Sequence, residues 1–242
     1  MAPAEAWQNE TFRKQHGNVL FLILIAVVLF AALSFVIAQS SRTGGQSPSA
    51  EKSKISGAEV SQYPTQLRAA VARMIINGLE YEQIKFNAPS AFSGLGVDVT
   101  EGIFHPSGGG AAYQLASPDV MANGAQGRWY FNPNFELDGI GTSLGASPEG
   151  NDFIAFLPGI ALGVCTEVND AADIGATIPI TNDYLSAIEQ DYDDTDAETI
   201  PNETVSLGAS ASGATELFGH PQGCFRNTAG GVYVYYQVVG ER

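Results

Sequence analysis

The stretch that decides the architecture is Asn18-Val-Leu-Phe-Leu-Ile-Leu-Ile-Ala-Val-Val-Leu-Phe-Ala-Ala-Leu-Ser-Phe-Val-Ile-Ala38. After Asn18 it runs for twenty residues without a charge and with a single hydroxyl group, at Ser34. At about 1.5 Å of rise per residue, a helix of this length spans about 30 Å, the thickness of the hydrocarbon core of a bilayer. A soluble domain of this size does not need a helix that is apolar on every face. The sequence therefore predicts a transmembrane helix at residues 18–41.

A removable signal peptide is the alternative for this segment. The apolar region of such a signal is about 7–15 residues long and is followed by a cleavage site with small residues. The present run is longer, although the small residues Ala31, Ala32 and Ala38 would allow cleavage by signal peptidase. Arg13 and Lys14 place residues 1–17 in the cytoplasm as a leader-like segment, but basic residues also follow the helix, so the charge bias is weak.

Composition favours an extracytoplasmic location for the rest of the chain. The protein has 26 acidic and 11 basic side chains, and the segment 129–225 has 16 Asp and Glu residues with no Lys or Arg. Such a surface repels phosphate groups, which excludes nucleic acid as a partner. Cys165 and Cys224 are the two cysteines, and in an exported domain they most simply form one disulfide. The alternative is a pair of free buried thiols in a cytoplasmic domain.

Residues 42–63 are expected to form a linker, with a possible short helix at 50–62. Its Gly44-Gly45 pair and Pro48 are typical of a flexible tether. A clearer helix is predicted after Pro64, with Gly78 closing it. Its apolar face repeats with helical spacing and comprises Leu67, Val71, Met74, Ile75 and Leu79.

From Phe86 onward, short apolar runs alternate with turn residues, which is typical of strands. The runs are 102–104, 111–115, 128–131, 153–157 and 231–239, and the last consists mainly of β-branched and aromatic residues. Residues 162–172 are expected to form a short helix with Leu162, Cys165 and Val168 or Asn169 on one side. The segment 64–242 is therefore predicted to be one α+β domain, in which an amphipathic helix packs on an antiparallel sheet.

The order of these features resembles the type IV pilin and type II secretion pseudopilin superfamily. In that resemblance Gly17 precedes the cut made by prepilin peptidase, and Asn18 becomes the new N-terminus. The segments 164–169, 223–225 and 232–239 look like the disulfide-bounded C-terminal region of such proteins. More narrowly, residues 17–26 and 104–110 are similar to uncharacterised alphaproteobacterial pilin-like membrane proteins. The resemblance covers the whole chain in order, through motifs of moderate specificity.

Two positions depart from the family pattern. Pilins usually carry phenylalanine or methionine first after the cut and glutamate fifth, where this chain has Asn18 and Leu22. In the family, that glutamate is thought to pair with a neighbouring subunit's amino terminus. The resemblance thus implies a minor or tip subunit of a surface filament or secretion assembly, anchored once in the bacterial inner membrane. The implied partners are the lipid bilayer, other pilin-like subunits and prepilin peptidase. The alternative is a single-pass anchored extracytoplasmic binding domain of unknown ligand.

No enzymatic activity is expected. Residues 141–145 match the G-x-S-x-G pattern around a hydrolase nucleophile, here Ser143. A loop follows this motif where that chemistry needs a helix, and only His105 or His220 would be available as base, so a glycine-rich turn is favoured. Residues 107–110 lack the ending of a phosphate-binding loop and also predict a turn.

Calcium is the cofactor that the sequence favours. Five carboxylates that suit this ion lie close together, although their spacing is not that of an EF-hand: Asp191, Asp193, Asp194, Asp196 and Glu198. A solvated acidic loop is the competing interpretation. Zinc held by the two cysteines with His105 and His220 is a weaker alternative, because the chain has no C-x-x-C pair. An aromatic set suggests either a binding groove or, more simply, core: Trp129, Tyr130, Phe131, Tyr233, Tyr235 and Tyr236.

Overall fold

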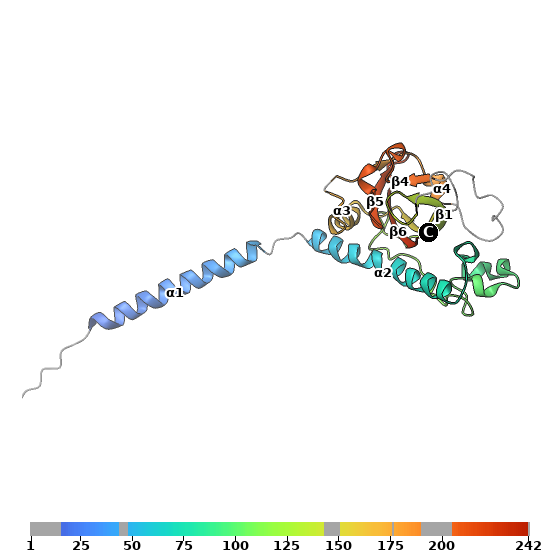
Figure 1. Ribbon diagram of the computed structural model, residues 1–242. Helices are drawn as coiled ribbons and strands as arrows, with labels where there is room; N and C mark the ends of the chain where they lie inside the picture. Colours follow the sequence, from blue (N-terminus) through green and yellow to red (C-terminus); the bar gives the residue numbers. More distant parts are fainter. Residues whose placement is uncertain (1–15, 44–47, 143–150, 176, 190–204, 242) are drawn as a thin grey trace, which may run out of the picture. The chain divides into compact units, whose positions relative to one another are not determined.

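The computed structural model describes residues 16–43, 48–142, 151–175, 177–189 and 205–241 (Figure 1). The chain divides into two units, Met1–Ser47 and Pro48–Arg242. The first contains α1, a single helix from His16 to Thr43. Its apolar sequence favours a helix because none of its central residues offers a polar side chain that competes for backbone hydrogen bonds, apart from Ser34. The predicted helix at 18–41 is confirmed.

The second unit begins with α2, which runs from Pro48 to Ile76. The predicted helix start at Pro64 is wrong, because Pro64 lies inside this helix and is buried. Proline fixes φ at a helical value but removes one backbone hydrogen bond, which costs about 3 kcal/mol in a helix interior. Burial offsets that cost, since Val60 and Leu67, on either side of the proline, both lie in the core.

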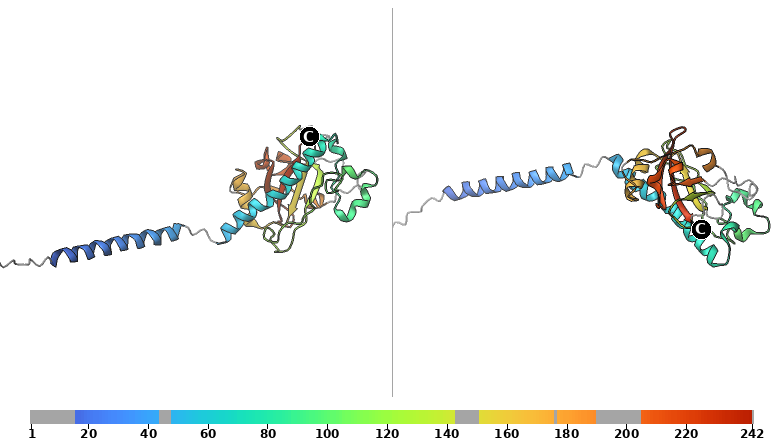
Figure 2. Two further views of the ribbon diagram at one scale, coloured as in Figure 1. Left: turned by 90° about the horizontal axis from the view of Figure 1, so that it is seen from below. Right: turned by 45° about the horizontal axis from the view of Figure 1, so that its top comes forward.

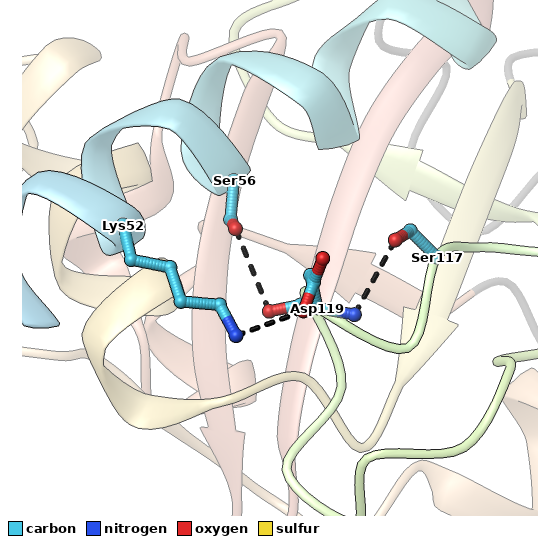
Figure 3. A network of polar contacts seen from close by, with 4 residues as sticks. All are labelled: Lys52, Ser56, Ser117 and Asp119. Atoms are coloured by element: carbon cyan, nitrogen blue, oxygen red, sulfur yellow. Dashed lines mark hydrogen bonds and ion pairs between the residues drawn. The ribbon is translucent and has the colours of Figure 1, made fainter.

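Contacts of the first half of α2 with a distant loop also favour its helical form (Figure 3). The Lys52 ammonium lies 2.8 Å from the Asp119 carboxylate, and the buried Ser56 hydroxyl donates to the Asp119 carbonyl oxygen at 3.5 Å. The Asp119 amide in turn donates to the Ser117 hydroxyl at 3.3 Å. The ion pair is exposed and contributes little by itself, but the buried serine fixes this turn of the helix against the domain.

Gly78 ends α2 as predicted. Its φ of 97° is in the left-handed region, and the Leu79 amide donates to the Met74 carbonyl while the Gly78 amide donates to the Ile75 carbonyl. This pair of bonds is a Schellman motif, which satisfies the last carbonyl groups of a helix. Leu79 consequently packs against the core although it lies beyond the helix.

The sheet has the strand order β3-β5-β6-β2-β1-β4. The strands are β1 (Tyr130–Leu137), β2 (Asp152–Pro158), β3 (Ile180–Thr181), β4 (Val205–Leu207), β5 (Gln222–Asn227) and β6 (Tyr233–Gly240). The four central strands β5, β6, β2 and β1 are antiparallel, whereas β4 pairs with β1 and β3 pairs with β5 in parallel. The predicted antiparallel sheet is therefore wrong at both edges, and the sheet is mixed.

Two further α-helices of the described domain are short, α3 (Leu162–Ala171) and α4 (Leu185–Ile188), and several 3-10 helices lie in its loops. The inward face of α3 was predicted only in part, because Cys165, Val168 and Asn169 are buried but Leu162 is 52% exposed and Val164 is buried instead. The predicted strand runs 102–104 and 111–115 form no strand; the Tyr113 ring packs edge-on against Phe104.

The sheet separates two hydrophobic cores. α2 packs on β6 and α3, and the left view of Figure 2 shows α2 crossing one face of the strands. The core on this face, called the α2-side core, includes Leu67, Trp129, Phe153 and Tyr235. The core on the opposite face is built from alternate residues of the same strands, Phe135, Ile154, Phe156, Tyr236 and Val238 among them. The coarse prediction of an α+β domain with a helix on a sheet is confirmed.

Candidate functional site

The apolar surface of α1 is the most unusual feature of the described chain. Every side chain from Val19 to Val36 is exposed, and this window is long and apolar enough to cross a membrane. Contiguous apolar surface of this extent marks a membrane or protein interaction segment, because water disfavours it. A signal sequence near the N-terminus would satisfy the same criteria of length and hydropathy. Gly17 and Asn18, the predicted processing residues, lie in the first turn of α1.

The predicted disulfide is confirmed. Cys165 of α3 bonds to Cys224 of β5 across a sequence separation of 59, with 5.4 Å between the Cα atoms. Both cysteines are fully buried. The same pair of elements is joined by Asn169, whose amide group donates to the Cys224 carbonyl at 2.9 Å and accepts from the Cys224 amide at 2.8 Å. Since both sulfur atoms are engaged, the zinc alternative is wrong.

The aromatic set does not form one groove. Tyr235 lies in the α2-side core and donates to Gln237 at 2.6 Å, whereas Tyr236 lies on the opposite face and donates to the His220 carbonyl at 2.9 Å. Neighbouring strand residues point to opposite faces, so the two rings cannot share a wall. The interpretation of these rings as core is confirmed for both.

Three members of the set do line a small pocket of about 180 Å³. Its aromatic walls are Phe86, Tyr113, Trp129, Tyr130 and Phe131, and its polar residues include Asn87, Ser90 and Arg128. The Arg128 guanidinium lies over the Tyr130 ring, 5.2 Å from its centre. The pocket is small compared with the sites of drug-sized ligands, and Trp129 and Phe131 are nearly buried beneath it.

The residues considered for hydrolysis do not come together as a described site. Ser143 lies outside the described residues. His105 accepts the Ser107 amide at its Nδ1 atom, 3.1 Å away, and its ring packs edge-on against Phe92. These contacts are those of a turn, as residues 107–110 predict.

The predicted calcium ligands Asp191, Asp193, Asp194, Asp196 and Glu198 all lie outside the described residues. Within the described part of the chain, no three His, Cys, Asp or Glu side chains gather as a metal cluster.

Four buried side-chain oxygen atoms of the described chain have no hydrogen-bond partner: Asn87 Oδ1, Asn134 Oδ1, Glu136 Oε2 and Asn151 Oδ1. Sequence reasoning missed the grouping of Asn134, Glu136 and Asn151, because only strand pairing brings β1 next to the start of β2. Such atoms are rare in native proteins, since an unpaired buried polar group costs about 1–3 kcal/mol.

No protein family model, curated protein or solved structure matches this chain. The interpretation of its function therefore depends on its own sequence and geometry.

Proposed function

We propose that this protein is a membrane-anchored, pilin-like structural subunit, with α1 in the bilayer and the disulfide-bonded domain outside the cytoplasm. The observation that carries the proposal is the surface of α1. Its side chains from Val19 to Val36 are all exposed in a helix without a charge in that window. Burial of this surface in lipid removes its contact with water, which stabilises the inserted helix.

The arrangement of the second unit supports the pilin-like part of the proposal. An apolar helix is followed along the chain by a second helix, α2, which packs on the antiparallel centre of a sheet. The disulfide closes the C-terminal half of the domain, as the resemblance implies. A disulfide persists in an oxidising compartment, which agrees with export of this unit.

The departures at Asn18 and Leu22 favour a minor or tip role. Without a glutamate at the fifth position after the cut, contacts between α1 and neighbouring subunit helices depend on apolar packing alone. Packing between apolar helices in lipid is weaker than contacts reinforced by polar groups.

Mass spectrometry of the mature N-terminus tests the proposal in cells that contain a prepilin peptidase. The expected N-terminus is Asn18, and Gly17→Leu should leave the leader attached. Ala38→Leu is the matched control, because it blocks a signal-peptidase cut but leaves processing at Gly17 intact. An N-terminus at or near Ala38 would contradict anchoring as well as assembly. An intact Met1 on a membrane-bound protein would contradict only the pilin-like role.

The second candidate is a tethered binding domain that acts alone. The pocket between Phe86 and Arg128 favours it, because it combines aromatic walls with a cationic side chain. Cross-linking in intact membranes separates the two functions: a pilin-like subunit forms cross-linked species through α1, whereas a solitary domain stays monomeric.

A further inference from the structure

Three of the four unpartnered buried oxygen atoms belong to one corner of the sheet. Asn134 and Glu136 are on β1, and Asn151 directly precedes β2, which pairs with β1. Glu136 and Asn151 are each only 2% exposed. The cluster is called the β1–β2 oxygen cluster.

Strand pairing places Glu136 and Asn151 on one face. Phe135 is paired with Asp152, so Glu136 and Asn151 are the next residues on the two antiparallel strands. Phe135 belongs to the core opposite α2, so Glu136 after it points toward the α2 side. Asn151 shares its face with Phe153, two residues on, which lies in the α2-side core.

A third strand contributes another oxygen to the same face. β4 runs parallel to β1, and its Ser206 is the partner of Glu136 in that pairing. Ser206 is partly buried. Asn134 lies two residues before Glu136, within the irregular part of β1 where the register shifts between Asn132 and Phe135.

The nearby carboxylate of Asp152, unlike that of Glu136, has a hydrogen-bond donor. Asp152 is fully buried, and its Oδ2 atom accepts the Leu137 amide at 3.0 Å. Glu136 Oε2 has no such donor. A buried carboxylate oxygen is strongly destabilising unless it is hydrogen-bonded, paired with a positive group or bound to a metal ion.

A single partner that serves all three oxygen atoms at once is an electron-pair acceptor with several coordination positions, such as a metal ion. All the unpartnered side-chain atoms among the described buried residues are oxygens, so the groups in this corner that lack a partner are hydrogen-bond acceptors. One water molecule donates two hydrogen bonds, which leaves one of the three atoms without a partner. The net charge of −15 also raises the local concentration of cations.

We propose that the β1–β2 oxygen cluster binds a calcium ion through Glu136, Asn134 and Asn151, with Ser206 beside them. Calcium takes carboxylate and amide oxygens in irregular, flexible geometry, whereas magnesium demands an octahedral site and keeps several waters. One carboxylate and two amides make a weak site, of the class that extracellular modules use, with a Kd of about 10⁻⁴–10⁻³ M. The proposed ligands include no residue of the acidic segment 191–198, and the proposal does not depend on the pilin-like role.

The test is thermal unfolding of the full-length, EDTA-stripped protein in detergent micelles. Calcium at 10 mM should raise the Tm of the wild type by about 3–6 °C, and the same concentration of magnesium should change it much less. Glu136→Gln, which keeps the side-chain shape, should lose the shift. The matched controls Glu216→Gln, at an exposed position, and Asp193→Asn/Asp194→Asn, in the acidic segment, should keep it.

If Glu136→Gln does not fold, a variant at Asn151 tests the same calcium site. Asn151→Asp adds a carboxylate to the cluster, so it should lower the Tm in EDTA and enlarge the calcium shift. A wild type that calcium does not stabilise would overturn the proposal. A full shift in Glu136→Gln, or its loss in the acidic-segment variant, would also overturn it by placing the ion elsewhere.

Discussion

The strongest covalent constraint in the second unit is the bond between Cys165 and Cys224, and its removal has a calculable effect. The double variant Cys165→Ala/Cys224→Ala deletes the cross-link but keeps the Asn169 hydrogen bonds that join the same elements. It therefore isolates the covalent contribution from the polar one.

The magnitude follows from the sequence separation of 59 between the cysteines. A loop of that length restricts the unfolded chain by about 4 kcal/mol in the chain-entropy model. Both sites are fully buried, so each alanine also leaves a small void that adds to the loss. The free energy of unfolding should fall by at least about 4 kcal/mol.

Urea unfolding of the full-length protein in detergent measures this change through the fluorescence of Trp129, which lies in the α2-side core. With a slope of about 2 kcal/mol per M, the midpoint should fall by about 2 M. Leu162→Ala is the control, because Leu162 lies on the same helix as Cys165 but is half exposed, and it should move the midpoint little. A double variant that unfolds within about 0.5 M of the wild type, with an unchanged slope, would refute the reasoning.

Three further predictions concern the same domain. Asn169→Ala leaves the Cys224 amide and carbonyl unpaired in the core and should cost about 2–4 kcal/mol in urea unfolding; a loss below 1 kcal/mol would contradict the role of this side chain. Gly78→Ala strains a backbone at φ 97° and should cost about 1 kcal/mol, whereas a gain in stability would show that the turn is not left-handed. Burial raises the pKa of the Tyr235 and Tyr236 phenols well above the ordinary value, so these groups stay neutral in the folded protein. Above about pH 10 the unfolded chain releases tyrosine protons that the folded protein keeps. The free energy of unfolding should therefore be unaffected by these groups below about pH 10 and fall above it, by up to about 1.4 kcal/mol per pH unit for each tyrosine. Urea midpoints that are equal at pH 8 and pH 11 would contradict this.

Local sequence patterns predicted the parts of the fold that depend on local chemistry. The apolar run after Asn18 is long and uniform, and α1 follows it closely. The β-branched and aromatic run 231–239 became β6, because such residues suit a buried pleated surface. The disulfide was predictable because only two cysteines are present.

The features of the fold that the sequence did not predict depend on tertiary contacts. A proline usually starts a helix, but Pro64 lies within α2 because the apolar face continues on both sides of it. The edge strands β3 and β4 have two and three residues, too few for a pattern, and their parallel pairing comes from chain segments far apart in sequence. The oxygen cluster likewise joins residues of β1 and β2 that no spacing relates.

Protease accessibility in spheroplasts tests the central claim most directly, that α1 anchors the chain in a membrane with the second unit outside. Protease added to the outside of intact spheroplasts should digest the domain and leave a small α1 fragment in the membrane pellet. Full-length protein that sediments with the membrane but stays protected would contradict the orientation. Full-length protein that remains in the soluble fraction without detergent would contradict the anchor itself.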